Sequence, residues 1–132
     1  MFLLVAFSSV QPKAQTTKDK WRLAHVVKNM KMDKPSAEKL TPLFFAYLKE
    51  LHEAKDIYDI IKKKYKKEID NHQLTDAQAH ELLHAHWRSE AQEVRVKLKY
   101  TTEFRQVLSE PEIFFLFRLA NDKAPSRLKS EE

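Results

Sequence analysis

The chain contains no glycine and no cysteine among its 132 residues. Phosphate-binding loops, dinucleotide-binding turns and two-residue β-hairpins need a residue that accepts positive φ without a Cβ clash. The missing glycine therefore excludes P-loop and Rossmann sites and disfavours hairpin-rich β folds. The missing cysteine excludes a thiol nucleophile, a disulfide framework and thiolate metal ligands. What remains favours a single helical domain with a binding or structural role, without catalytic residues.

Long apolar runs are also scarce. Residues 2–10 (FLLVAFSSV) form an apolar stretch that is too short for the roughly 20 residues of a membrane-spanning helix. The stretch is typical of a signal-peptide core, although no basic residue precedes it. We therefore expect an exported protein with a signal peptide over residues 1–14, a helical domain over residues 15–120 and a polar flexible tail over residues 121–132.

Apolar spacing predicts helices over residues 18–30, 33–69, 75–108 and 113–119. In the second helix, apolar and aromatic residues recur alternately three and four positions apart, at Leu40, Phe44, Tyr47, Leu51, Ala54, Tyr58, Ile61 and Tyr65. This seven-residue repeat is typical of a helix packed lengthwise on another helix. For the third helix the predicted inner side consists of Leu83, Trp87, Ala91, Val94, Leu98, Thr101 and Leu108. The expected fold is all-α: an elongated antiparallel hairpin of two long helices with a short N-terminal and a short C-terminal helix.

Polar residues mark where these helices begin. Thr75 and Gln78 have the spacing of a capping box, in which each side chain accepts a hydrogen bond from the other residue's backbone N–H. Ser109 and Glu112 repeat the pattern before the last helix. Asp33 is a favourable N-cap for the second helix.

Leu74-Thr75-Asp76-Ala77-Gln78 matches LTxxQ, and with it most of residues 18–120 resembles the Spy/CpxP family of periplasmic helical chaperones and stress regulators. Met32 and Asp33 stand at the equivalent place in a degenerate first copy of the motif. The resemblance implies a cradle-like homodimer in the periplasm that holds unfolded or misfolded proteins without ATP. Some members of the family instead bind a sensor kinase or a metal ion. The expected function is therefore that of an ATP-independent chaperone-like or envelope-stress regulatory protein, whose partners are unfolded clients or a stress sensor.

A candidate client surface lies beside the apolar stripe of the second helix and at its end. Its predicted members are Phe45, Leu48, Ile57, Ile60, Lys62, Lys63 and Lys66. Exposed apolar side chains bind unfolded chains, and surrounding lysines attract them. A nucleic-acid patch is an alternative interpretation of the five lysines around Tyr65, at positions 62, 63, 64, 66 and 67. Pairs with acidic residues four positions apart favour a solvated helix end instead, and we expect no nucleic-acid partner. Trp87, Phe114, Phe115 and Phe117 are predicted to pack in the core, with contact to clients as the alternative.

His80-Glu81-Leu82-Leu83-His84 is a literal match to the HExxH motif of zinc peptidases. Two histidines four residues apart share a helix face and can bind Zn²⁺, with the glutamate as general base. Nothing in the sequence singles out Glu103 or Glu112 as a third ligand, so the main prediction has no metal, no cofactor and no enzymatic activity. One alternative is a histidine-based metal sensor or buffer of the same fold, in which His80 and His84 bind Zn²⁺ or another divalent transition metal, with His72 or a second chain's histidine. A metallopeptidase and a helical adaptor without chaperone role are further alternatives.

Overall fold

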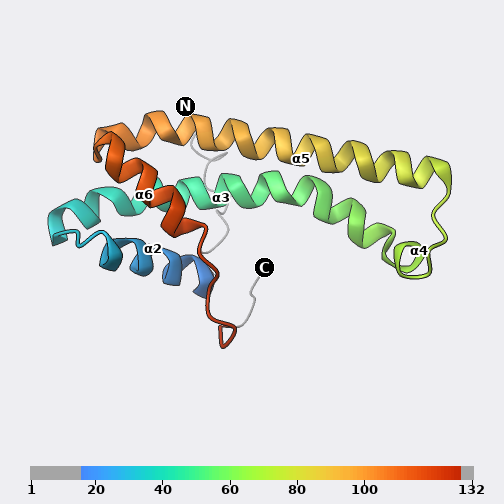
Figure 1. Cartoon of the computed structure of the whole chain (residues 1–132), viewed down its shortest axis with the longest axis horizontal. Helices are drawn as coiled ribbons and strands as arrows, with labels where there is room; N and C mark the ends of the chain where they lie inside the picture. Colours follow the sequence, from blue (N-terminus) through green and yellow to red (C-terminus); the bar gives the residue numbers. More distant parts are fainter. Residues whose placement is uncertain (1–15, 129–132) are drawn as a thin grey trace, which may run out of the picture.

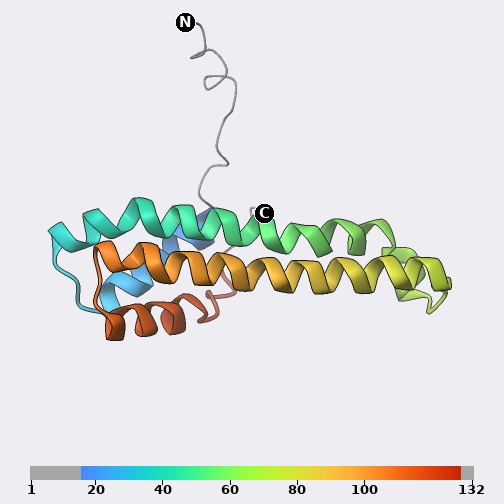
Figure 2. The same cartoon turned by 90° about the horizontal axis from the view of Figure 1, so that it is seen from above.

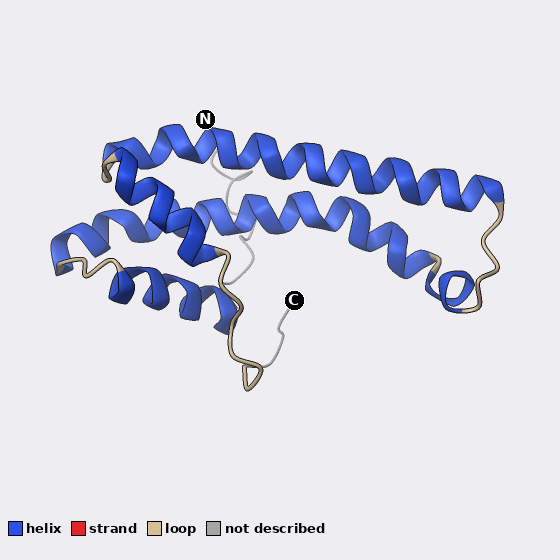
Figure 3. Ribbon diagram, viewed as in Figure 1, coloured by secondary structure: helices blue, strands red, loops and turns tan. Residues whose placement is uncertain are grey.

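The structure is a computed structural model that describes residues 16–128. The predicted signal peptide, residues 1–14, and the last four residues of the predicted tail lie outside the described residues. All regular structure between residues 16 and 128 is helical (Figures 1 and 3), which confirms the all-α prediction for this part of the chain. The elements are α2 (Thr17–Asn29), α3 (Lys34–Lys64), α4 (Lys66–Asp70), α5 (Asp76–Glu103), the 3-10 turn η1 (Phe104–Gln106) and α6 (Glu110–Ala120).

The two long helices, α3 and α5, lie side by side and run in opposite directions (Figures 1 and 2). At 1.5 Å per residue they are about 46 Å and about 42 Å long. Helices α2 and α6 pack together at the end where α3 begins and α5 ends, whereas α4 lies at the opposite end (Figure 1). One end of the described molecule is thus built from four helices, and at the other end the long helices pack mainly on each other.

The helices begin at the residues that the capping patterns indicate. The Thr75 hydroxyl oxygen accepts a hydrogen bond from the Gln78 N–H at 3.1 Å, and the Gln78 side chain accepts one from the Thr75 N–H at 3.0 Å. Ser109 and Glu112 form the same reciprocal pair before α6. The Asp33 carboxylate accepts the Ser36 N–H at 2.8 Å. These predicted helix starts are confirmed, since each depends only on residues three positions apart.

Two helix ends place non-glycine residues in the left-handed region. Lys31, with φ of 53°, follows α2, and His72, with φ of 56°, follows α4. After α2, the Met32 N–H bonds to the Val27 carbonyl and the Lys31 N–H to the Lys28 carbonyl, which is the Schellman arrangement that glycine most often terminates. The glycine-free chain therefore uses lysine and histidine at positions where a Cβ costs roughly 1–2 kcal/mol.

The seven-residue repeat of α3 faces its neighbours as predicted. All eight of its residues are buried or half-buried. The predicted helix over residues 33–69 is nevertheless interrupted at Tyr65, where φ is −108°. The Tyr65 hydroxyl donates a hydrogen bond to the Glu81 carboxylate of α5 at 2.5 Å. The break in the helix thus accompanies a contact with a residue 16 positions away, and the pattern of residues around Tyr65 does not predict it.

The predicted inner side of α5 is wrong for most of its residues. Leu83, Trp87, Val94 and Leu98 are between 54% and 65% exposed, and Ala91 is exposed as well. The residues of α5 that are buried are Leu82, Ala85, Ser89, Val96 and Tyr100. At 100° per residue the two sets lie on nearly opposite sides of the helix. Helix α5 therefore has two apolar faces, and the sequence pattern identified the one that does not face α3.

Small residues explain which face of α5 packs against α3. Ala85 is 0% exposed and Ser89 is 4% exposed, and Ala54 of α3 is 1% exposed. The Ser89 hydroxyl donates a hydrogen bond to the Ala54 carbonyl at 2.8 Å. These short side chains let the two backbones approach closely, and the larger Leu83 and Trp87 lie on the other face of the helix.

The hydrophobic core lies at the four-helix end. Phe104 is 0% exposed, and its ring centroid lies 5.8 to 5.9 Å from the centroids of Tyr47, Tyr100 and Phe117. The core cluster draws on every helix of this end through Val26, Leu40, Phe44, Tyr47, Leu48, Ala54, Val96, Tyr100, Phe104, Leu108, Ile113 and Leu116. The joint between α5 and α6 is thus held by aromatic packing.

Glu50 accepts hydrogen bonds from two residues of α5 near this end. The Tyr100 hydroxyl and the Lys99 ammonium donate hydrogen bonds to its carboxylate. Burial raises the pKa of Glu50, but these hydrogen bonds outweigh it and leave the pKa below its ordinary value. Burial and the Glu50 carboxylate raise the pKa of Tyr100.

We expect the unfolding midpoint Tm to fall as the pH is lowered from about 5 to about 3, and to fall less in the Glu50→Gln variant. The folded chain binds the Glu50 proton less tightly than the unfolded chain does, so protonation favours unfolding. The stabilisation is complete above the ordinary carboxyl pKa and is lost as the pH falls through the folded pKa. Thermal unfolding followed by circular dichroism measures the two slopes, and equal slopes would contradict the role given to Glu50.

Candidate functional site

The outward side of α5 carries a row of exposed apolar residues, which we call the α5 stripe: Leu83, Trp87, Val94 and Leu98. Their spacings of four, seven and four residues place them on one side of the helix. Each exposes more than half of its surface. Within residues 16–128 no helix packs over this stripe.

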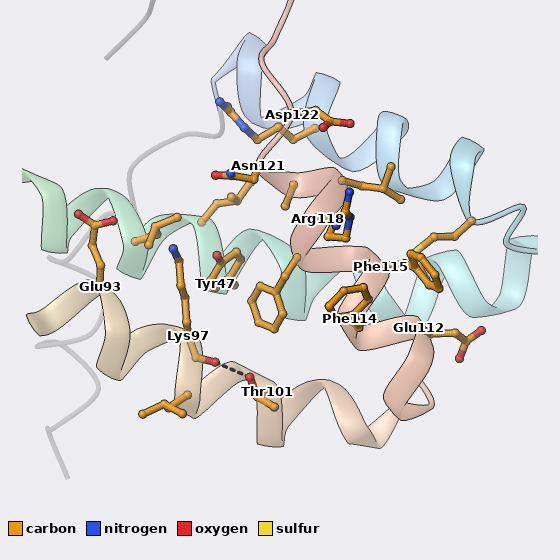
Figure 4. A pocket seen from close by; sticks show the side chains of 18 of the residues that line it. Tyr47, Glu93, Lys97, Thr101, Glu112, Phe114, Phe115, Arg118, Asn121 and Asp122 are labelled. Carbon is orange, nitrogen blue, oxygen red and sulfur yellow. Dashed lines mark hydrogen bonds between the residues drawn. The ribbon is translucent and has the colours of Figure 1, made fainter. Parts of the chain in front are cut away.

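A groove of about 1270 Å³ lies between α2, α3, α5 and α6. Its apolar lining consists mainly of Tyr47, Leu48, Leu51, Val94, Leu98, Phe114, Phe115 and Phe117. Figure 4 shows Phe114 and Phe115 on α6 and Lys97 and Thr101 on α5. Val94 and Leu98 belong both to this lining and to the α5 stripe, so the stripe runs onto the edge of the groove. The two features form one continuous surface.

The charged residues that line the groove leave an excess of uncommitted positive charge. Two of its three carboxylates are used inside the molecule, because Asp122 bonds to His25 at 2.7 Å and Glu112 caps α6. Four cationic residues, Arg22, Lys55, Lys97 and Arg118, line the groove. Arg118 lies over the Phe114 ring, and the other three side chains form no hydrogen bond or ion pair with any other described residue. Such cations attract flexible acidic or mixed-charge chains toward the apolar lining.

The client surface predicted on α3 is not a single patch. Leu48 is 2% exposed and belongs to the core, so it is not an exposed residue of α3, although it also lines the groove. Phe45 is half-buried against the core and Ile57 is half-buried, whereas Ile60 is 63% exposed. Leu48 is buried because α3 has further helices around it at this end, which a pattern along α3 alone does not reveal.

The three predicted lysines do come together, at the far end of α3. Lys62, Lys63 and Lys66 line a shallow depression with Ile69 and Asp70. Lys62 pairs with Asp59 at 3.7 Å and Lys66 with Asp70 at 2.7 Å. The lysines therefore lie apart from the groove, and two of them are partly neutralised.

Three of the four aromatic residues predicted for the core are exposed instead. Trp87, Phe114 and Phe115 are 57%, 58% and 53% exposed, and only Phe117 packs against the core. Helix α6 buries Ile113 and Leu116 and leaves the intervening phenylalanines outside. The signal that could have found this surface is the surplus of apolar residues in α5 and α6, which a helix with one partner cannot bury on all sides.

The glutamate of the HELLH motif is engaged by residues at the end of α3. Glu81 accepts the Tyr65 hydroxyl and pairs with Lys64 at 3.6 Å. The hydrogen bond from Tyr65, aided by the charge of Lys64, lowers the pKa of Glu81. Within residues 16–128 no three histidine, aspartate or glutamate side chains are grouped to hold a metal ion. Glu103 ends α5 and Glu112 lies in α6, both at the end of the molecule opposite His80 and His84 (Figure 1).

None of the helices between residues 16 and 128 has the length and apolar character that a membrane crossing requires. No family model, curated protein or solved structure matches the chain. The resemblance of residues 74–78 to the Spy/CpxP motif stays an expectation from the sequence.

Proposed function

We propose that the protein is an ATP-independent, Spy/CpxP-like periplasmic protein that holds partially unfolded polypeptides on the α5 stripe and the adjoining groove, as a chaperone or as part of an envelope-stress response. The observation that carries the proposal is the second apolar face of α5, which lies opposite the face that packs on α3. A contiguous apolar surface of this kind on a soluble domain is typical of a protein-binding site.

The chemistry of the surface suits reversible binding of an unfolded chain. Burial of apolar area contributes about 25 cal/mol per Å², and the ordering of a flexible client opposes this gain. The balance gives moderate affinity, so a client can leave without energy from nucleotide hydrolysis. The uncommitted cations of the groove attract the client before contact. The proposed function needs no covalent step and no cofactor.

A cradle-like homodimer belongs to the proposal because the resemblance to Spy/CpxP implies one. An elongated pair of helices with an open apolar side can present a wider surface as two copies than as one. Light scattering and solution X-ray scattering on residues 15–132 measure the molar mass and shape. A compact monomer at high micromolar concentration would contradict the dimer.

Suppression of client aggregation tests the proposal directly. Purified residues 15–132 are mixed, without nucleotide, with an enzyme that aggregates on heating, and turbidity is followed. We expect suppression near a one-to-one molar ratio. An unrelated helical protein of similar net charge, at the same mass concentration, is the control. Undiminished aggregation at a several-fold molar excess over the client would overturn the proposed function.

A further inference from the structure

The six histidines of the chain fall into distinct environments. Three of them are paired with carboxylates: His25 with Asp122 at 2.7 Å, His52 with Asp19 at 3.0 Å, and His86 with Glu90 at 3.1 Å. His72 terminates α4 in the left-handed region. His80 and His84 differ from these, because both are exposed and neither forms a hydrogen bond or an ion pair with the residues that the structure describes.

His80 and His84 face each other on the first turns of α5. Their ring centroids lie 4.1 Å apart and the ring planes are inclined by 42°. Residues four positions apart lie one above the other on a helix, and the capping box of Thr75 and Gln78 fixes the backbone one turn earlier. The two rings are therefore held near each other by the helix itself, so little side-chain freedom is lost when both bind the same ligand.

Two imidazoles in this arrangement match the demands of one late transition-metal ion. Ligand nitrogens at 2.0–2.1 Å from a tetrahedral ion lie roughly 3.3 Å apart. Small rotations of the two rings, whose centroids lie 4.1 Å apart, can reach this separation. Imidazole suits Zn²⁺, Cu²⁺ and Ni²⁺ and is a poor ligand for Mg²⁺. The neighbouring Glu81 is occupied by Tyr65 and Lys64, so the protein offers two nitrogen ligands and no carboxylate.

We propose that His80 and His84 together chelate a divalent late transition-metal ion, with water in its remaining coordination positions. Two protein ligands are fewer than the four of a structural zinc site or the three of a catalytic one. The site is therefore exchangeable and fits metal buffering or sensing. By the Irving–Williams order, the site should bind Cu²⁺ more tightly than Ni²⁺ or Zn²⁺. The proposal does not depend on the chaperone role, because it concerns different side chains and a different ligand.

Calorimetric titration of tag-free residues 15–132 with CuCl₂, ZnCl₂ and MgCl₂ tests this site. We expect saturable binding of one Cu²⁺ per chain, weaker Zn²⁺ binding and no Mg²⁺ binding. His80→Ala and His84→Ala should each weaken Cu²⁺ binding at least 10-fold, since either change leaves a single imidazole. His86→Ala is the matched control, because its ring is already paired with Glu90 and its loss should leave the Cu²⁺ affinity unchanged.

Two further readouts separate chelation from adventitious binding. Electron paramagnetic resonance of the Cu²⁺ complex should show nitrogen coupling from two ligands, and the His80→Ala variant should lose one of them. Saturating metal should raise Tm in the wild type and not in the His80→Ala, His84→Ala double variant, because only the folded helix holds both rings together. Equal affinity in the double variant and the wild type, or millimolar binding of every metal, would overturn the proposal.

Discussion

Replacing Phe104 with alanine is expected to lower the free energy of unfolding by about 3–5 kcal/mol. Phe104 is fully buried and joins the end of α5 to α3 and α6 through three aromatic neighbours, Tyr47, Tyr100 and Phe117. Its removal leaves a cavity that rigid aromatic rings cannot collapse to fill. Small domains have a total stability of about 5–15 kcal/mol, so the change removes a large fraction of what holds the four-helix end together.

Urea unfolding of the Phe104→Ala and Phe115→Ala variants measures this effect. Phe115 is 53% exposed, and its truncation removes the same atoms from an open site, with an expected change within about 0.5 kcal/mol. The comparison separates loss of a buried ring from loss of a phenylalanine as such. Equal destabilisation of the two variants would mean that α6 packs on the core through a different face.

The Trp87→Ser, Leu98→Ser double variant is expected to lose client binding by about 2 kcal/mol, or roughly 30-fold in affinity. The two side chains are 57% and 65% exposed and mark the middle and one end of the α5 stripe. Because they contribute little to the monomer's core, thermal unfolding should show the variant as stable as the wild type. The readout is the amount of protein needed for half-maximal suppression of client aggregation.

Ile60→Ser is the matched control for this variant. Ile60 is 63% exposed on α3, belongs to the surface predicted from sequence, and lies outside both the stripe and the groove. Its replacement should leave suppression unchanged. Full activity in the double variant together with loss in Ile60→Ser would move the binding surface from α5 to α3.

Local patterns in the sequence predicted much of the fold. Thr75 with Gln78 and Ser109 with Glu112 determine helix starts through hydrogen bonds between neighbours in the chain, so no knowledge of the tertiary structure was needed. The repeat from Leu40 to Tyr65 identified the buried side of α3, because that helix has one dominant apolar face. The break at Tyr65 accompanies a hydrogen bond to Glu81 on another helix, which no pattern along α3 predicts.

The candidate binding surface was harder to predict, because α5 carries apolar residues at helical spacing on two of its faces. The row from Leu83 to Leu98 has the larger side chains and so gives the stronger apolar signal, yet Ala85 and Ser89 make the close contact with α3. Large apolar side chains make a helix face easy to recognise in the sequence, but they keep two helix backbones apart. Leu48 was predicted to be exposed and is buried, because helices that lie far from it in the chain cover it.

The unequal number of helices at the two ends makes stability uneven along the molecule. Beyond Ala54, the described part of α3 contributes nothing to the core cluster, and α5 joins that cluster only from Val96 onward. Local unfolding should begin where only the two long helices pack together, and should leave the four-helix end folded. Leu83 and Trp87 lie on the two-helix part of the molecule, and Leu98 lies beside the four-helix end. A partner bound along the α5 stripe would therefore contact both parts and restrain the less stable one.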